Sequence, residues 1–293
     1  MAATIERVTI IGTGLIGGSV GLSLRSAGYT GQIIGWDHSP VELSIALERG
    51  AITAIHDDPY EACIGSDVIV LAVPVLGILD WMHRAKNLIG PGTLLTDVGS
   101  TKAAIMETAE RLYSFEPGQP ARAEFLGGHP MAGKESGGAA LADGELFRGA
   151  TWIFTPMASR AGLPSPLSDA WRQWVQKFGC RTMDIDAARH DVICAWVSHL
   201  PQMLSTALSA LLEDEFGDAE DMRAIGGRAL REMTRLGASP YSMWRDVALS
   251  NTQPLADTLS ALEQRLAHLR ENLKTPELRE EFIKANCFRA PRV

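Results

Sequence analysis

The sequence predicts an α/β domain built on a mostly parallel sheet, followed by an all-helical domain. The first observation is a series of apolar, β-branched runs separated by helical stretches, which is typical of parallel strands buried on both faces. The second is a glycine-rich turn between the first such run and the first helical pattern. The third is that no strand-like run follows residue 186, after which the pattern is helical.

The strand-like runs set the domain boundary. They cover residues 8–11, 32–37, 68–73, 93–98, 124–126, 151–154 and 181–185. Residues 156–166 hold several turn formers and are interpreted as a surface loop, because a helix and the last strand follow them. We therefore expect a nucleotide-binding domain at residues 1–188 and a helical domain at residues 189–293.

A glycine-rich turn joins the first strand to the first helix within residues 8–19. In its GxGxxG pattern Gly12 permits a tight turn, Gly14 lets a pyrophosphate approach the backbone, and Gly17 lets the helix pack on the strand. This turn predicts a dinucleotide-binding, Rossmann-type domain. Four further residues are expected to contact the cofactor, namely Leu15, Ile16, Val73 and Pro74.

An acidic residue follows the second strand. Asp37 lies at about the expected distance, roughly 20 residues or slightly more after the turn, to bind the ribose hydroxyls of NAD. The adjacent His38, Ser39 and Pro40 offer no arginine to neutralise the extra phosphate of NADP. An acid at this place can also cap a helix or a turn, but motif, strand and acid agree on NAD as the cofactor.

One histidine lies among glycines and prolines in residues 127–138, directly after a strand-like run. Open α/β sheets bind ligands at the carboxyl ends of their strands, so His129 is placed for chemistry. By itself, a histidine in a glycine-rich loop is more often a satisfied structural residue than a catalyst. The segment gains weight from the nucleotide-binding motif before it.

Composition limits the partners that we expect. The chain has 293 residues, 46% hydrophobic, and a net charge of −8 without a long lysine and arginine cluster, which argues against nucleic acid or an anionic membrane. Its four cysteines form no CxxC pair, so we expect reduced thiols and no metal site. The N-terminus runs directly into the first strand without a signal peptide, which favours a cytoplasmic location.

Two long apolar features mark the helical domain. Residues 192–212 contain no Asp, Glu, Lys or Arg, but their polar residues favour a buried central helix over a membrane span, with a kink or helix start at Pro201. An apolar seam suited to another helix is formed by Leu259, Leu262, Leu266, Leu269 and Leu273. The spacing fits an intrachain core as well as a subunit interface, but the amount of apolar surface favours a homodimer.

Taken together, the motifs resemble those of the prephenate/arogenate dehydrogenase family of tyrosine biosynthesis. The resemblance extends over nearly the whole chain, and its segments are residues 12–19, 96–102, 128–137, 190–191, 198–201, 234–235 and 243–246. HPMAGxExSG followed by SHLP and then by TR and MWRD is specific in combination. The family implies a Rossmann-type domain, a helical dimerisation domain, and an NAD-dependent oxidative decarboxylation that makes the substrate ring aromatic.

The resemblance also implies roles for single residues. His129 accepts the hydrogen bond from the ring hydroxyl as general base, and Ser100 orients His129 or the hydroxyl. Arg235 binds the ring carboxylate, for which a guanidinium fork is suited. Glu135 and Glu232 resemble family acids that form an ionic gate with this arginine. The other substrate-binding residues implied are His199, Gln202 and Trp244, the last reaching the site from the neighbouring subunit.

Each of these residues also has a structural interpretation. Ser100 can cap the helix that follows it. His199 can be a satisfied buried histidine, and Trp244 can be ordinary core. Arg235 can pair with a surface acid, although an arginine in an otherwise apolar domain is better explained as a substrate clamp.

The sequence departs from the family pattern where substrates are distinguished. Gln202 takes the place of the second histidine in the SHLPH segment of many prephenate-active members. Prephenate and arogenate share the ring and its carboxylate, but the side chain carries a keto group in prephenate and an ammonium in arogenate. Gln202 can donate a hydrogen bond to the keto group or accept one from the ammonium. We expect prephenate to be preferred, with tolerance for arogenate. Because the sequence ends at Val293, we expect no fused chorismate mutase or ACT domain.

Two rival functions were weighed against this one. A β-hydroxyacid dehydrogenase pairs a similar nucleotide domain with a helical domain but needs a catalytic lysine there, and Lys274 and Lys284 lack a suitable surround. A non-catalytic nucleotide sensor would have no need of Ser100, His129 and Arg235 together.

Overall fold

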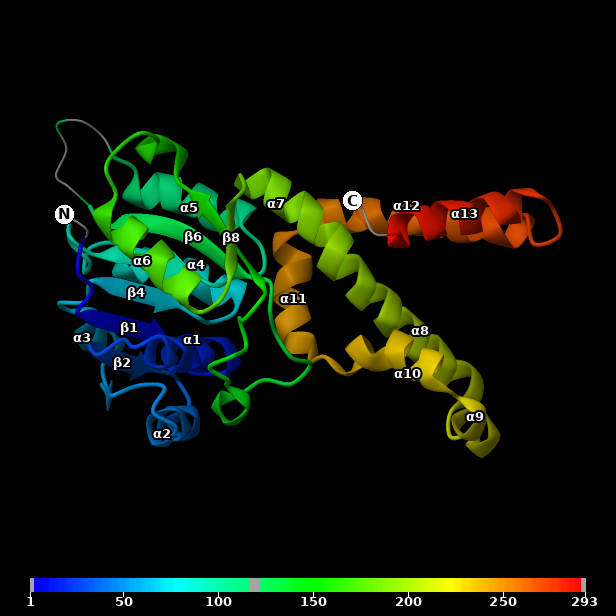
Figure 1. The fold of residues 1–293 in the computed structure, drawn as a ribbon, viewed down its shortest axis with the longest axis horizontal. Coiled ribbons are helices and arrows are strands. Elements are labelled where there is room, and N and C mark those ends of the chain that lie inside the picture. The colour runs from blue at the N-terminus through cyan, green and yellow to red at the C-terminus, as the bar shows by residue number, and fades with distance from the viewer. Residues whose placement is uncertain (1–2, 116–117, 119–121, 291–293) are drawn as a thin grey trace.

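The computed structural model describes residues 3–115, 118 and 122–290. A sheet domain holds the N-terminal part of the chain, and a helical domain extends from it as two separate arms (Figure 1). The last strand ends at Asp184 and the first helix of the helical domain begins at Ala187. The boundary between residues 188 and 189 stays a prediction.

The described strands form one sheet in the order β3-β2-β1-β4-β5-β6-β7-β8. They are β1 (Arg7–Ile11), β2 (Gln32–Trp36), β3 (Ala54–Ile55), β4 (Val68–Leu71), β5 (Leu94–Asp97), β6 (Glu124–Pro130), β7 (Thr151–Pro156) and β8 (Arg181–Asp184). Neighbours pair in parallel, except for β6 with β7. The mostly parallel α/β domain is therefore confirmed, whereas β3 was missed because two residues show no pattern.

Helices cover both faces of the sheet. One face packs against α1 (Leu15–Ser26), α2 (Pro40–Glu48) and α6 (Pro166–Lys177), and the other against α3 (Pro59–Cys63), α4 (Val75–Ala85) and α5 (Ala103–Tyr113). Strand side chains alternate between these two cores: in β4, Val68 and Val70 face the first, and Ile69 and Leu71 the second. A strand that buries both faces explains the nearly continuous apolar runs of the sequence.

The chain order reverses between β1 and β4, which lie side by side in the sheet. Ligands of open α/β sheets bind in the crevice outside the carboxyl ends of the strands at such a switch point. The glycine-rich turn follows β1, Val73 and Pro74 follow β4, Ser100 follows β5, and His129 lies at the end of β6. The topology thus brings the predicted cofactor and catalytic residues to one edge.

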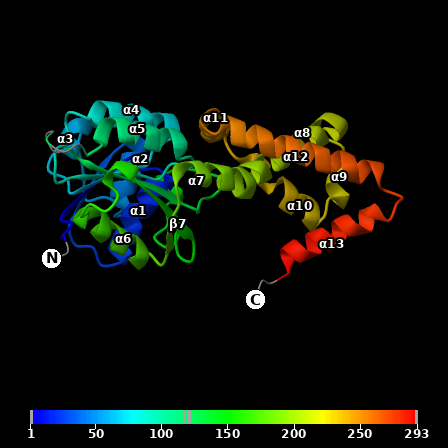
Figure 2. The same cartoon turned by 90° about the horizontal axis from the view of Figure 1, so that it is seen from above.

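The helical domain begins with one long interrupted helix. This helix consists of α7 (Ala187–Cys194), the π-helical segment η3 (Ala195–His199) and α8 (Leu200–Phe216). The rest of the domain consists of α9 (Glu220–Ile225), α10 (Arg228–Thr234), the 3₁₀ turn η4 (Arg235–Ala238), α11 (Tyr241–Ser250), α12 (Thr252–Glu271) and α13 (Glu277–Arg289). Pro201 lies in the first turn of α8, directly after the π-helical segment, so the predicted kink or helix start beside His199 corresponds to this interruption of the helix. Seen from above, α12 and α13 form a hairpin that extends away from the sheet domain (Figure 2).

One prediction about this domain was wrong. Residues 192–212 do not form a buried helix, because Trp196 is 50% exposed, Val197 59% and Leu211 56%. Buried positions such as His199 and Gln202 line the site, whereas Trp196 and Leu211 stay exposed among the described residues. Across the described residues, no helix is both long enough and apolar enough to cross a membrane.

Candidate active site

The glycine-rich turn between β1 and α1 has the backbone that its sequence predicts. Gly12 has a φ of 93°, and a side chain there would overlap the carbonyl oxygen of Ala72. A Cβ at Gly17 would overlap the carbonyl oxygen of Gly12, whereas a Cβ at Gly14 would meet nothing within 4 Å. Gly14 therefore borders open space at the N-terminus of α1, where no side chain caps the helix. Such a turn fits the pyrophosphate of a dinucleotide.

Asp37 lies directly after β2, with its carboxylate against the same turn. Oδ2 accepts a hydrogen bond from the backbone N–H of Thr13 at 2.8 Å, and Oδ1 accepts one from Ser39 at 2.9 Å. Asp37 therefore caps the turn, which was the structural alternative to a role in cofactor binding. An ionised carboxylate has about four acceptor positions, so capacity remains for ribose hydroxyls. The turn at the N-terminus of α1 and the acceptor positions of Asp37 together fit NAD.

Two adjoining cavities open at the carboxyl ends of the strands. The first, of about 270 Å³, is lined by the predicted cofactor residues Leu15, Ile16, Val73 and Pro74. The second, of about 410 Å³, is lined by the whole predicted catalytic and substrate-binding set, namely Ser100, His129, Glu135, His199, Gln202, Arg235 and Trp244. Ser100 and Glu135 border both cavities. Volumes of 300–1,000 Å³ are usual for small-molecule sites, so the second cavity suits a metabolite.

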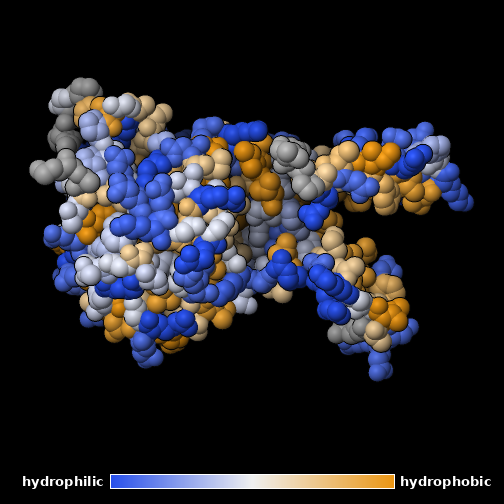
Figure 3. All heavy atoms as spheres, in the orientation of Figure 1, coloured by the Kyte–Doolittle hydropathy of each residue, from blue (hydrophilic) through white to orange (hydrophobic). Residues whose placement is uncertain are grey.

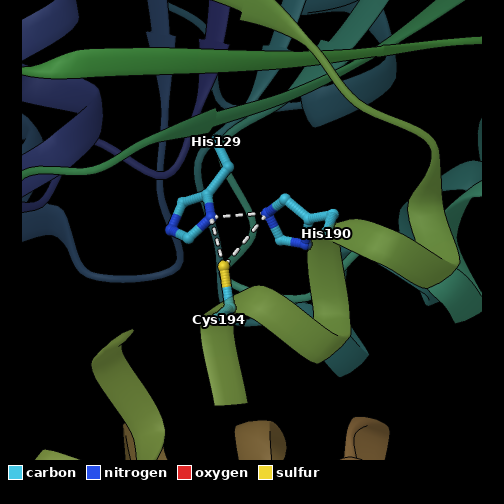
Figure 4. Close-up of side chains that lie close together, drawn as sticks. All are labelled: His129, His190 and Cys194. Carbon is cyan, nitrogen blue, oxygen red and sulfur yellow. Dashed lines mark hydrogen bonds between the residues drawn. The ribbon is translucent and has the colours of Figure 1, made fainter. Parts of the chain in front are cut away.

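A buried group of three side chains, His190, Asp191 and Cys194, adjoins Nδ1 of His129, the predicted general base. His129 Nδ1 lies 2.8 Å from His190 Nε2, and His190 Nδ1 lies 2.7 Å from Asp191 Oδ1. The Cys194 sulfur lies 3.5 Å from His190 Nε2 and 3.9 Å from His129 Nδ1. In Figure 4 the other ring nitrogen of His129, Nε2, points away from this group. His190 and Cys194 both come from α7, the first helix of the helical domain.

Burial keeps two histidines of the site, His129 and His199, neutral. Burial lowers the pKa of His129 well below its ordinary value of 6.5, and the nearby His190, Lys102 and His199 lower this pKa further. Burial also lowers the pKa of His199, to about 4, although Asp191 acts in the opposite direction. A neutral imidazole can accept a proton, which a general base at neutral pH requires.

A buried ion pair supports the loop that carries Ser100. The Lys102 ammonium has no exposed surface and lies 2.5 Å from Asp97 Oδ2, and it also donates to the backbone carbonyls of Gly99 and Thr101. Asp97 accepts from the backbone N–H of Gly128 at 3.0 Å. Because a buried charge without a partner is costly, this pair fixes the ends of β5 and β6 relative to each other.

Arg235 enters the second cavity from the start of η4 and forms an ion pair with Glu135. The pairing expected from the family is therefore present for Glu135. It is wrong for Glu232, which pairs with Arg228 at 2.6 Å. These two residues lie four apart on α10, where side chains face each other directly. The Arg235 side chain is 61% exposed, so its charge is open to a ligand.

His199, Gln202 and Trp244 form the far wall of the second cavity. Asn251 lies 3.2 Å from His199 Nδ1 and can only donate through its amide nitrogen, so the His199 proton belongs on Nε2. The Gln202 amide nitrogen donates to Leu236 O at 2.7 Å and to Thr206 at 3.2 Å, which leaves its oxygen as the free acceptor. The Trp244 indole N–H is buried and has no hydrogen-bond partner among the described residues.

Two expectations about this wall and its surroundings were wrong. Trp244 lines the cavity of its own chain, because α11 packs on α4 and places the indole against the His199 ring, with 5.9 Å between centroids. Ser100 does not cap the helix that follows it. Helix α5 begins at Ala103, and the Asp191 carboxylate accepts from the N–H groups of Lys102 and Ala103 at 2.7 and 2.8 Å.

Sequence reasoning missed several residues of the site. The pair His190 and Asp191 was noted as part of a motif but was given no role, and Cys194 was interpreted only as a core thiol. Lys102 and Asp97 were noted only as motif residues. A signal did exist, because a histidine next to an acid in a helix beside the site is a frequent way to orient a catalytic imidazole.

The atoms of His129, His190 and Cys194 also have the composition of a metal site, the one such group found among the described residues. A tetrahedral zinc ion with bonds of about 2.0–2.1 Å to nitrogen holds its ligand atoms about 3.3 Å apart. The two nitrogens lie 2.8 Å apart, which is the length of a hydrogen bond with a proton between them. The prediction that the protein needs no metal stays a prediction.

Known proteins share both domains. The family model for the prephenate dehydrogenase nucleotide-binding domain matches residues 20–166, and that for the prephenate dehydrogenase dimerization domain matches residues 186–285. Prephenate dehydrogenase of Lactococcus lactis subsp. cremoris is 32% identical over 271 residues, which cover 91% of this chain and 70% of that protein.

Solved structures agree over almost the full length. Prephenate dehydrogenase from A. aeolicus in complex with hydroxyphenyl propionate and NAD+ superposes with a TM-score of 0.83 at 26% identity, covering 99% of this chain and 98% of that one. Synechocystis arogenate dehydrogenase has a TM-score of 0.76 at 28% identity, covering 97% and 98%. With both family models matched, this chain belongs to the prephenate dehydrogenase family.

Proposed function

We propose that this protein oxidises prephenate with NAD⁺, releasing CO2 and leaving 4-hydroxyphenylpyruvate. It is an NAD-dependent dehydrogenase of the family identified above. The observation that carries the substrate proposal is the pair of adjoining cavities, one lined by predicted cofactor residues and the other by a neutral histidine and an accessible arginine. A nucleotide sensor would have no use for the second set.

The chain's residues divide the work. NAD⁺ would be held by the glycine-rich turn and Asp37, and it would supply the acceptor for the hydride of the ring carbon that bears the hydroxyl. His129 takes up the hydroxyl proton, for which its burial keeps it neutral. Ser100 lies between the two cavities, where a hydroxyl can orient the reacting oxygen. Arg235 binds the ring carboxylate in exchange for Glu135, because a substrate carboxylate offers the guanidinium the same partner.

The far wall of the cavity bears on the substrate side chain. The His199 Nε2 proton is a donor, which suits the oxygen of a keto acid. The Gln202 oxygen is an acceptor, which suits the ammonium of arogenate. The three residues of this wall include no acid to pair with an ammonium, which favours prephenate, and arogenate is the second candidate.

The protein is further proposed to work as a homodimer through the helical domain. Figure 3 shows hydrophobic side chains on both arms, with open space between the arms. Exposed apolar residues on these arms include Leu211, Phe216, Leu266, Leu273 and Phe282, each at least 50% exposed. A dimerization-domain model matches this region. A cytoplasmic location also stays a prediction.

The substrate proposal is tested by kcat/KM for prephenate and for arogenate, each with NAD and with NADP. We expect the highest value for prephenate with NAD. A kcat/KM for arogenate more than about tenfold above that for prephenate, equal to about 1.4 kcal/mol of transition-state discrimination, would reverse the assignment.

A further inference from the structure

We propose that His190 and Asp191 are positioning residues that fix the tautomer of His129. They hold the proton of His129 on Nδ1 and so leave the Nε2 lone pair free as the base. The inference rests on the proposed function for the role of His129, but the tautomer itself can be measured without turnover.

The order of protons follows from the hydrogen-bonding capacity of each group. An ionised Asp191 carboxylate can only accept, so the 2.7 Å contact places a proton on His190 Nδ1. With its one ring proton on Nδ1, His190 offers Nε2 as an acceptor. The 2.8 Å contact between this atom and His129 Nδ1 needs one proton, which must come from His129. His129 is left with an unprotonated Nε2, the nitrogen that points away from the cluster (Figure 4).

Asp191 is held firmly enough to set this order. Its two oxygens accept from the backbone N–H groups of Lys102 and Ala103 at the N-terminus of α5. A helix N-terminus stabilises a negative charge. Asp191 is 2% exposed and His190 has no exposed surface, so water does not compete for these bonds.

The arrangement also joins the two domains chemically. His129 belongs to β6 of the sheet domain, whereas His190 and Asp191 belong to α7 of the helical domain. The base is therefore in its reactive tautomer only when α7 is docked on α5. The Cys194 thiol, whose pKa is raised to about 12 by burial, stays neutral and adds no charge to the chain of protons.

The test combines a spectroscopic and a kinetic measurement on the full-length protein. Long-range ¹H–¹⁵N correlation spectra of protein labelled with [¹⁵N]histidine report which ring nitrogen of His129 carries the proton, with H129N used to assign the signal. We expect the wild type to show a protonated Nδ1 at neutral pH. A protonated Nε2 in the wild type would overturn the proposal.

Two variants separate positioning from packing. In H190Q the amide oxygen can accept from His129 and the amide nitrogen can donate to Asp191, so we expect the tautomer to persist and kcat to fall by less than about tenfold. In H190L both bonds are lost, so we expect the Nε2-protonated form and a kcat lower by about 10² to 10³, with the KM for prephenate and the Kd for NAD within about twofold.

Arg189→Ala is the matched control, because it truncates an exposed side chain of α7 directly before His190 and removes no link in the chain of protons. We expect the wild-type tautomer and a kcat within about threefold of wild type. An H190L variant that keeps full kcat and the wild-type tautomer would refute the proposal, and if H190L does not fold, the spectra of the wild type and H190Q decide. A correct tautomer in a protein that does not turn over prephenate would count against the proposed function alone.

Discussion

The two domains of this chain differ in how much of their apolar surface they bury. The sheet domain has two cores that enclose the strands on both faces. In the described residues beyond 199, Val247 and Leu255 are the buried hydrophobic side chains, and many others are exposed. The sheet domain is thus complete within one chain, whereas the helical domain requires further contacts to bury its apolar surface.

The site reflects the same contrast. The cofactor turn and His129 are fixed by packed strands and buried hydrogen bonds, whereas Arg235 comes from a short 3₁₀ turn and is 61% exposed. The sheet domain, with helix α7 docked on it, therefore positions the cofactor and the base, and the outer part of the helical domain brings the carboxylate clamp. Mutations should separate these contributions into effects on kcat and effects on KM.

The largest effect is expected from a mutation in the sheet domain. His129→Asn should lower kcat by roughly 10² to 10⁴ while the Kd for NAD stays nearly unchanged, because only proton acceptance is removed. Steady-state kinetics and a cofactor titration on the same preparation check this. Near-normal kcat at neutral pH would show that His129 is structural.

In the helical domain, Arg235→Ala should raise the KM for prephenate by about 30-fold or more, because the ring carboxylate loses its charged partner. Lysine at this position should restore only part of the affinity, since it lacks the planar fork. The matched control is R228A, which removes an exposed arginine paired with Glu232 on the same arm. Equal KM values for R235A and R228A would mean that the ring carboxylate is held elsewhere.

A smaller effect is expected at the cofactor. Asp37→Ser removes the acid that we expect to bind the ribose, and a hydrogen bond to a charged group contributes about 1.5–3 kcal/mol. The kcat/KM with NAD should therefore fall by about 10-fold to 150-fold, and activity with NADP should rise. A variant that gains nothing with NADP would contradict the role of Asp37.

Dilution of the protein should weaken the proposed dimer contacts of the helical domain. If a partner covers the arms, specific activity should fall as the dimer dissociates, together with the molar mass from light scattering. A monomer with full activity at nanomolar protein would show that the exposed apolar arms need no second chain.

The smallest effect is expected from pH. His129 acts in its neutral form, and its pKa lies well below the ordinary value of 6.5, so lowering the pH from 8 to 6 should not protonate it. The kcat/KM for prephenate should change by less than about twofold, whereas a base with a pKa of 6.5 would lose about fourfold. A fourfold loss in this range would show that the base is not shielded by burial.

The sequence predicted most of what is local. The glycine-rich turn, the strands from β4 to β8 and the helix start at Pro201 each depend on neighbouring residues, and the structure has them. Contacts between distant segments were harder to foresee. His129 and His190 are 61 positions apart, and only the docking of α7 on α5 brings them together.

The errors have the same origin. The helix at residues 192–212 was expected to be buried because it is apolar, but burial depends on which elements surround it, and Trp196 and Leu211 remain exposed in this chain. Glu232 was expected at Arg235 from the family pattern, but Arg228, four residues before it on α10, pairs with it. The first outcome cannot be read from the sequence pattern, whereas the second follows the i, i+4 spacing of a helix.

The most direct test of the account is the stoichiometry of one reaction. Purified protein would be incubated with prephenate and NAD⁺, and NADH, CO2 and the organic product would be measured in the same sample. We predict equal amounts of NADH, CO2 and 4-hydroxyphenylpyruvate with the wild type, and formation of all three at a rate lower by roughly 10² to 10⁴ with H129N. NADH formation without CO2, or no NADH from prephenate at all, would contradict the proposed oxidative decarboxylation.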